Sequence, residues 1–167
     1  MDDVRLEGLL RENRGKIFRL ALRLTGNRQD ALDVTQETMM AAYRYRGRFR
    51  GEAKFSTYLY RIGVNFSFSL LKKRKNRAHV PLEMARELAS GVPDPAQALK
   101  QGESAERMRR MLEELPPRRR AAIHLRLYDD LSFNEIAAAL GCRPATARTL
   151  FFFGVRNLRK RLGVSGG

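Results

Sequence analysis

Apolar residues recur at helical spacing along almost the whole of this chain. In residues 4–24 they follow the three- and four-residue steps of an amphipathic helix, and Gly26 is placed to end that helix. Similar patterns predict helices over residues 28–46 and 55–77, with a loop at residues 47–51. The alternation that a half-buried strand needs never persists beyond a few residues. The pattern therefore predicts an all-α fold.

A change in composition divides the 167 residues into two parts. Residues 80–104 contain three prolines and two glycines and are slightly acidic. Such a stretch is typical of a linker, with room for one short helix at residues 82–89. We therefore expect two small helical domains, residues 1–79 and 105–167, joined by a flexible linker.

The second of these domains has the pattern of a helix-turn-helix. Helices are predicted over residues 105–115 and 118–128. Ser132 and Glu135 have the spacing of a capping box, which should open a short third helix, and Gly141 is placed to end it. A short helix, a glycine turn and a longer basic helix form the DNA-reading unit of many regulators.

The last helix should begin near Pro144 and run to about Leu162. Its expected buried stripe is Ala147, Phe151, Val155 (or Gly154), Leu158 and Leu162. The residues left on its outer side are Thr146, Arg148, Thr149, Phe152 and Arg156. Arginine and threonine can reach base edges and phosphates, and an aromatic ring can pack on thymine methyl groups. A plain helical hairpin inside a core is the alternative for this segment taken alone.

The formal net charge of +15 is concentrated in one block. Residues 43–80 hold eleven basic side chains and one acidic side chain, a net charge of +10. A solvated face would usually mix both signs, so a block of one sign favours a polyanionic partner, most simply nucleic acid. Aromatic residues alternate with the basic ones in YRYRGRFR, and exposed aromatics beside charge suit unstacked bases.

Some of these aromatic residues must belong to the core instead. Five apolar residues form one helical stripe: Phe55, Leu59, Ile62, Phe66 and Leu70. A pocket for a base outside the stack needs a polar reader and an aromatic wall. Asn65, in an otherwise apolar helix, is a candidate reader, and an amide satisfied in the core or at the surface is the alternative. The basic run at residues 72–77 predicts phosphate contacts, with a solvated tail as the alternative.

Three segments, in this order and at this separation, resemble the extracytoplasmic-function sigma factors of bacterial RNA polymerase, of the sigma-70 family, which carry only region two and region four. LTGNRQDALDVTQETMMAAYR resembles region two, and FSTYLYRIGVNFSFSLLKKRK resembles the segment that melts and reads the minus-ten element. LEELPPRRRAAIHLRLYDDLSFNEIAAALGCRPATARTL resembles region four. The resemblance covers about residues 5–163. It implies that residues 1–79 are region two and residues 105–167 are region four.

The resemblance also implies roles for individual residues. Those that would dock on the clamp helices of the largest polymerase subunit are Asp33, Gln36, Glu37 and Met40. Those that would open and hold the minus-ten DNA, with the loop at residues 47–54, are Arg48, Tyr58, Arg61, Asn65, Lys72, Lys73 and Arg74. Region four would sit on the flap of the second-largest subunit. Its contacts to the minus-thirty-five element would come from Thr146, Arg148, Thr149, Phe152 and Arg156.

The sequence departs from the family pattern at several of these places. Tyr58 stands where the family usually has tryptophan, and Ser69 stands where it usually has aspartate. Leu150 and Phe153 occupy positions where the family is commonly basic. We therefore expect altered or weaker minus-thirty-five reading, with more weight on DNA shape and phosphate contacts. The alternative is that the aromatic cluster contacts another protein.

Other function classes find little support in the sequence. There are no clustered carboxylates, no nucleophile–base pair and no phosphate-binding loop, so we do not expect an enzyme. The single cysteine and the two histidines lack ligand partners at metal-binding spacing, so neither a metal nor another cofactor is expected. The runner-up function is an autonomous helix-turn-helix regulator that binds duplex DNA without polymerase.

Nothing in the sequence suggests a membrane span or a signal peptide. The longest nearly uncharged stretch, residues 62–71, is too short to cross a bilayer, and the N-terminus mixes both charges. We therefore expect a cytoplasmic protein. The resemblance implies an anti-sigma factor as a further partner, which could hold the chain at the inner membrane.

Overall fold

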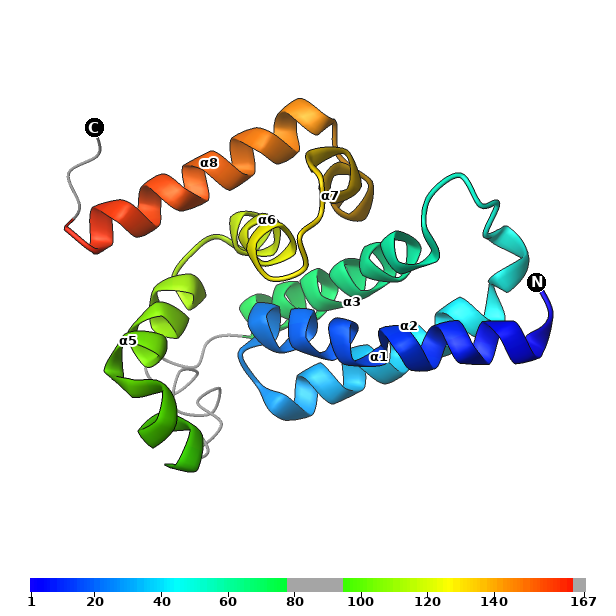
Figure 1. Cartoon of the computed structure of the whole chain (residues 1–167), viewed down its shortest axis with the longest axis horizontal. Helices are drawn as coiled ribbons and strands as arrows, with labels where there is room; N and C mark the ends of the chain where they lie inside the picture. Colours follow the sequence, from blue (N-terminus) through cyan, green and yellow to red (C-terminus); the bar gives the residue numbers. More distant parts are fainter. Residues whose placement is uncertain (78–94, 164–167) are drawn as a thin grey trace.

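The computed structural model describes residues 1–77 and 95–163, and the side chains of residues 1–77 and 104–163. These ranges contain seven α-helices, one 3-10 turn and no strand (Figure 1). The helices are α1 (Asp3–Thr25), α2 (Arg28–Arg44), α3 (Phe55–Arg77), α5 (Pro95–Glu113), α6 (Pro117–Leu127), α7 (Phe133–Leu140) and α8 (Pro144–Arg161). The all-α prediction is confirmed. No helix in the described ranges is long and apolar enough to span a bilayer.

Helices α1, α2 and α3 pack side by side and form the first domain (Figure 1). Local signals set their ends. The α1 helix stops at Gly26, whose φ of 68° lies in the left-handed region that glycine adopts without strain. The side chain of Asn27 then accepts a hydrogen bond from the Asp30 backbone N–H and opens α2. Helix α2 ends at Arg44, two residues earlier than expected. The 3-10 turn Arg46–Arg48 follows it and leads into the predicted loop.

The prediction is wrong at the start of α5. That helix begins at Pro95, ten residues before the predicted start, so residues 95–104 are helical. Proline suits a first helical turn, and the alanine, glutamine, leucine and lysine that follow are good helix formers. A single glycine, Gly102, is not enough to break the helix. The predicted short helix at residues 82–89 lies outside the described residues.

Helices α6, α7 and α8 form the predicted helix-turn-helix. The capping box is present: Ser132 Oγ accepts from the Glu135 N–H at 3.1 Å, and Glu135 Oε1 accepts from the Ser132 N–H at 3.2 Å. Gly141 ends α7 with a φ of 67°, and Pro144 is the first residue of α8. One expectation fails. Leu162 follows the helix as its cap and is 39% exposed, because the last turn of α8 runs past the core.

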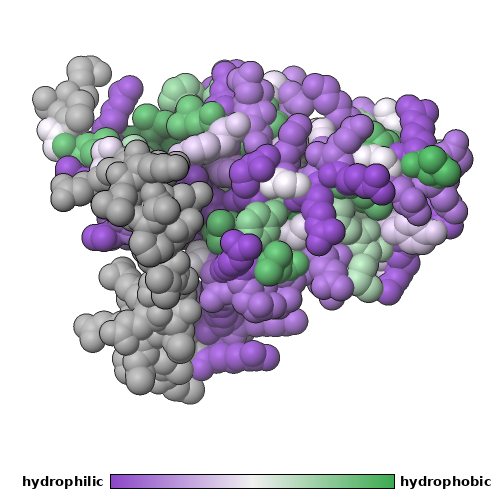
Figure 2. Space-filling model, turned by 60° about the horizontal axis from the view of Figure 1, so that its bottom comes forward, coloured by the Kyte–Doolittle hydropathy of each residue, from purple (hydrophilic) through white to green (hydrophobic). Residues whose placement is uncertain are grey.

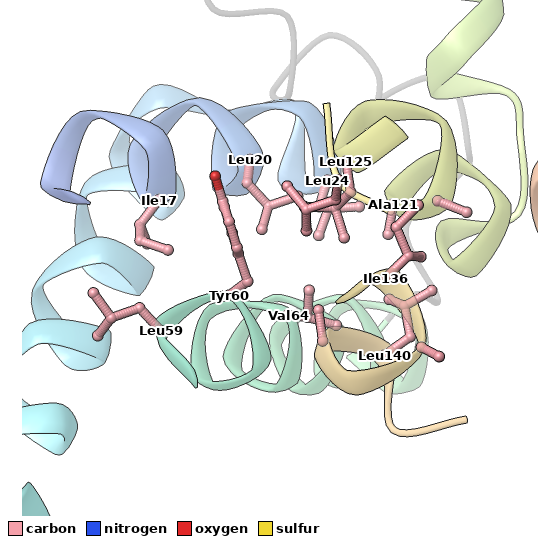
Figure 3. Close-up of a cluster of buried hydrophobic side chains, with 14 of the residues drawn as sticks. Ile17, Leu20, Leu24, Leu59, Tyr60, Val64, Ala121, Leu125, Ile136 and Leu140 are labelled. Atoms are coloured by element: carbon pink, nitrogen blue, oxygen red, sulfur yellow. The ribbon is translucent and has the colours of Figure 1, made fainter. Parts of the chain in front are cut away.

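The two domains share one hydrophobic core. Side chains from α1, α3, α6 and α7 meet in a single cluster, in which Leu24 and Val64 of the first domain lie beside Leu125 and Ile136 of the second (Figure 3). The predicted stripe of α3 is only part of its buried surface, because Tyr60 is also buried, at 2% exposure. Helix α3 thus packs against its own domain on one side and against α7 on the other.

A buried arginine joins the same two domains. Arg120 of α6 donates hydrogen bonds to the carbonyl oxygen of Leu24 at 2.8 Å, and to those of Glu113 at 2.6 Å and Leu115 at 2.8 Å. Those acceptors lie at the C-terminal ends of α1 and α5, where the helix dipole favours a cation. Burial lowers the pKa of Arg120 from its ordinary value. Since arginine remains protonated in proteins, one cation binds two helix ends.

A second polar contact lies nearby in the interface. His124 Nε2 of α6 is 3.4 Å from Asp129 Oδ2; the His124 side chain is buried, and that of Asp129 is 9% exposed. Burial opposes ionisation of Asp129, but His124 and the Tyr60 hydroxyl of α3 together hold its pKa below the ordinary value. Arg23 of α1 lies over the ring of Tyr128, which stacks on His124. The interface between the domains is therefore specific as well as apolar.

Candidate polymerase and nucleic-acid interfaces

The predicted polymerase-binding residues lie together on the outer face of α2. This helix buries Val34, Thr38 and Ala42 against its neighbours. The opposite face exposes the predicted set, Asp33, Gln36, Glu37 and Met40. Their side chains are free to contact a partner, apart from a 3.2 Å hydrogen bond from Gln29 to Asp33. Met40 is 47% exposed and is the apolar member of an otherwise polar face.

That face continues into a shallow hollow at the end of α2. Its lining residues are Met39, Met40, Tyr43, Arg44 and Arg46. The guanidinium of Arg46 lies 4.6 Å from the centroid of the Tyr43 ring. Exposed methionine and tyrosine beside cations suit a partner with both apolar and acidic groups. Of these lining residues, only Met40 was predicted to bind the polymerase.

The loop before α3 is anchored by three aromatic rings. Phe49 packs at 5.3 Å, centroid to centroid, from both Phe55 and Tyr58. Tyr58 is half-buried, and burial raises its pKa, against an opposing effect of Arg48. Phe49 was not among the predicted site residues. It holds the basic loop against α3 and thereby places the cations of that loop.

A cavity of about 270 Å³ opens beside this cluster. The loop at residues 48–53 lines it together with Thr57, Tyr58 and Arg61 of α3, and Ala138 of α7 completes the wall. Three predicted minus-ten residues, Arg48, Tyr58 and Arg61, thus share one cavity. A flipped base needs an aromatic wall and polar groups, and the cavity offers both.

The other predicted minus-ten residues lie farther along α3 and differ in their surroundings. Asn65, Lys72 and Lys73 are exposed and available for contact. Arg74 is already engaged: it pairs with Asp30 and donates a 3.0 Å hydrogen bond to the carbonyl oxygen of Thr25. Burial lowers the pKa of Arg74. Its observed contacts hold α3 to the turn between α1 and α2.

The loop and the residues predicted to bind the minus-ten DNA also touch the second domain. Lys54 of the loop pairs with Glu135 of α7, with 3.6 Å between Nζ and Oε2. A Cβ built on Gly141 would lie 3.7 Å from Nη2 of Arg61. Helix α7 therefore covers one edge of the loop and of the cavity.

Helix α8 exposes every residue predicted for its outer side. These are Thr146, Arg148, Thr149, Phe152 and Arg156. Phe152 is 56% exposed, and its neighbour Phe153 is 45% exposed. The buried side consists of Ala147, Gly154 and Leu158, with Phe151 half-buried beside them. The helix therefore presents a mixed basic and aromatic face to solvent.

Phe133, at the start of α7, organises one edge of that face. Its ring contacts Phe151 and Phe152 of α8. Arg126 lies 4.6 Å and Arg148 lies 5.4 Å from its centroid, so two cations stack on one ring. Arg126 was not among the predicted site residues, since its contact depends on how α6 and α7 fold together. Figure 2, which views another side of the molecule, shows hydrophilic residues over most of the visible surface, interrupted by small hydrophobic patches.

Comparison with known proteins identifies both domains. The model of Sigma-70 region 2 matches residues 9–77, and that of Sigma-70, region 4, matches residues 105–158. The chain is 32% identical to the RNA polymerase sigma-H factor of Pseudomonas aeruginosa, over 82% of the chain and 75% of that protein. It is 32% identical to the ECF RNA polymerase sigma factor SigW of Bacillus subtilis, over 88% and 83%. It is 36% identical to the ECF RNA polymerase sigma-E factor of Escherichia coli, over 74% and 69%.

Two solved structures share the fold. The sigma factor RpoE, in complex with the anti-sigma factor NepR from Bartonella quintana, superposes with a TM-score of 0.77 at 23% identity, over 99% of this chain and 100% of that one. CnrH, in complex with the cytosolic domain of CnrY, superposes with a TM-score of 0.67 at 22% identity, over 99% and 92%. With region two on α1–α3 and region four on residues 105–158, the chain belongs to the sigma-70 family of RNA polymerase sigma factors, in its extracytoplasmic-function group.

Proposed function

We propose that this chain directs RNA polymerase core to specific promoters and opens the minus-ten DNA for transcription initiation. It would act as a dissociable specificity subunit with no catalysis of its own. The observation that carries the proposal is the combination, on one small all-helical chain, of three exposed surfaces. These are the polar face of α2, the basic aromatic loop with its cavity, and the outer face of α8.

The face of α2 would bind the clamp helices of the largest subunit. Asp33 and Glu37 are exposed one turn apart, with Gln36 and Met40 beside them. Acidic groups near an exposed methionine suit a partner surface that combines cations with apolar contacts. Region four would sit on the flap of the second-largest subunit.

The loop at residues 47–54 and α3 would capture the melted minus-ten strand. Tyr58 supplies an aromatic wall that Phe49 and Phe55 keep in place, and Arg48 and Arg61 supply charge at the same cavity. Stacking on an aromatic ring is worth about 1–3 kcal/mol per base, enough to favour a base that has left the duplex. Asn65, exposed on the same helix, would read a base edge, and Lys72 and Lys73 would contact the backbone.

Helix α8 would enter the major groove at the minus-thirty-five element. Thr146, Arg148 and Thr149 lie near its N-terminal end, the part of a recognition helix that reaches base edges. Phe152 and Arg156 follow on the same exposed side, and Phe152 suits a thymine methyl group. The departures at Leu150 and Phe153 would shift weight from base reading toward shape and phosphate contacts.

An anti-sigma factor is the regulator we propose. Both structural neighbours were solved as complexes, one with the anti-sigma factor NepR and one with CnrY. By analogy with these complexes, a partner of this kind would hold the present chain silent, and it could place the chain at the inner membrane.

Reconstitution with core polymerase tests the proposal. Run-off transcription from a randomised promoter library should give initiation at a defined sequence class with core plus this chain, and none with either alone. The autonomous-regulator alternative predicts instead that the chain binds its target duplex tightly without core. Absence of promoter-dependent initiation with every compatible core would refute the sigma-factor function.

Variants assign the surfaces in the same assay. Tyr58→Ala should reduce initiation on duplex promoter at least tenfold, and a promoter with a pre-melted minus-ten bubble should recover most of that loss. Asp33→Lys should weaken binding to core on both templates. Arg107→Ala, which removes an exposed cation of α5 away from all three surfaces, is the control and should leave initiation unchanged.

A further inference from the structure

Phe153 lies at one edge of α8, and an arginine from another helix lies over its ring. Phe153 stands where the family pattern is commonly basic. The guanidinium of Arg119, from α6, lies 5.2 Å from the centroid of the Phe153 ring. Its Nη1 also donates a 2.9 Å hydrogen bond to Asn157 Oδ1, one turn farther along α8. Arg119 is therefore held at two points on the surface of α8.

Close packing of the two helices brings Arg119 to that place. Gly154 is buried where α6 crosses α8. A Cβ built at Gly154 would lie 2.9 Å from Ile123 and 3.5 Å from the backbone oxygen of Arg119. The backbone of α6 thus lies against α8 at this point, within side-chain reach of Phe153 and Asn157. A larger residue at position 154 would push the helices apart and move the cation.

The cation lies beside the face that would enter DNA. Phe153 follows Thr149 by one helical turn on the exposed side of α8. At the other edge of the same face, Arg148 lies over Phe133. A helix in the major groove has a phosphate backbone on each side, so a cation at each edge matches both walls of the groove.

We propose that Arg119 makes a backbone-phosphate contact at the minus-thirty-five element and replaces the basic residue that α8 lacks at position 153. Phe153 and Asn157 are positioning residues for it. Arginine carries five N–H donors, and the hydrogen bond to Asn157 uses one, so others remain for a phosphate oxygen. Because the side chain is already held, less rotamer freedom is lost when DNA binds. A phosphate contact of this kind strengthens binding without reading sequence.

This inference rests on the proposed function, and its test uses holoenzyme reconstituted from core and the full chain. The probe is a duplex that carries only the minus-thirty-five element selected from the randomised library. The slope of log K against log salt is negative, and Arg119→Ala should reduce its magnitude by about 0.9, the value for one phosphate contact. Over the tenfold range from 1 M to 0.1 M salt, the variant should therefore gain about eightfold less affinity than the unmodified chain. The loss should be the same for the selected element and for a scrambled one.

Variants at the supporting residues separate this role from a structural one. Phe153→Ala should weaken binding about two- to fivefold, the range of an exposed cation–π contact, and should have no further effect in the Arg119→Ala background. Phe153→Arg combined with Arg119→Ala should restore the slope, since it returns a cation to the same edge. Asn157→Ala leaves both Arg119 and Phe153 in place, so it tests the contact even if Arg119→Ala folds poorly. It should weaken binding severalfold.

Arg107→Ala is the control for the loss of one positive charge from region four, and its salt slope should equal that of the unmodified chain. An unchanged slope for Arg119→Ala in holoenzyme that still initiates would overturn the inference and leave the proposed function standing. Failure of Phe153→Arg to restore the slope would also overturn it. Holoenzyme that cannot initiate even with the unmodified chain would instead contradict the proposed function.

Discussion

Replacement of the buried Arg120 by leucine should loosen the contact between region two and region four. The leucine keeps the apolar stem but removes donors to the carbonyl oxygens of Leu24, Glu113 and Leu115, all 2.6–2.8 Å away. Each hydrogen bond to a charged group is worth about 1.5 kcal/mol or more, and the recovered cost of burying the guanidinium offsets part of the sum. We expect a loss of about 3 kcal/mol in the free energy of unfolding.

Urea unfolding of the full chain, followed by circular dichroism, measures that loss. Small-angle X-ray scattering at zero urea should give a larger radius of gyration for Arg120→Leu than for the unmodified chain, because one of the three acceptors belongs to α1. Arg118→Leu changes an exposed arginine on the same helix and should stay within about 0.5 kcal/mol. If Arg120→Leu and the unmodified chain had equal stability and equal size, Arg120 would not hold the two domains together.

Three further predictions concern helix packing, capping and pH. Gly154→Ala should lower the free energy of unfolding in urea by about 1 kcal/mol, because overpacking against Ile123 exceeds the gain in helix propensity. Gly8 has open space around it, so Gly8→Ala should raise the free energy of unfolding by up to about 1 kcal/mol. Ser132→Ala removes the capping box of α7 and should lower the thermal midpoint, with a free-energy loss of about 1 kcal/mol. The pKa of Asp129 is lower in the folded chain than in the unfolded one, where it is about 3.9. Ionised Asp129 therefore contributes its full stabilisation of the fold above about pH 3.9, and this contribution is lost as pH falls through the pKa of the folded state. Asp129→Asn should therefore flatten the acid loss of stability below about pH 4, and an unchanged acid slope would contradict this assignment.

The candidate surfaces divide into those that a linear pattern reveals and those that it does not. Asp33 and Glu37 were predicted on one face of α2, and α2 does expose them together. Arg74 belonged to a basic run that predicted phosphate contact, yet it pairs with Asp30 inside region two. A charge run does not show which of its members folds back on the protein, because that depends on which helix end lies next to it.

The helical class and the local ends of the helices were predictable from the amino-acid sequence alone. Gly26 and Gly141 end their helices, and Ser132 with Glu135 opens α7, through contacts between residues no more than four apart. Such contacts form within one turn of chain and need no distant partner. The start of α5 was missed because propensity is a weak guide where prolines and helix formers occur together.

The contact between the two domains, and the set of cations at each surface, depend on how the helices pack in three dimensions. Arg120 and Leu24 are 96 residues apart, and Arg119 and Asn157 are 38 apart. Helical periodicity shows which face of a helix is apolar, but it does not say which other helix covers that face. Which helices pack together determines that Tyr60 of α3 is buried. It also determines that Arg119 lies over Phe153.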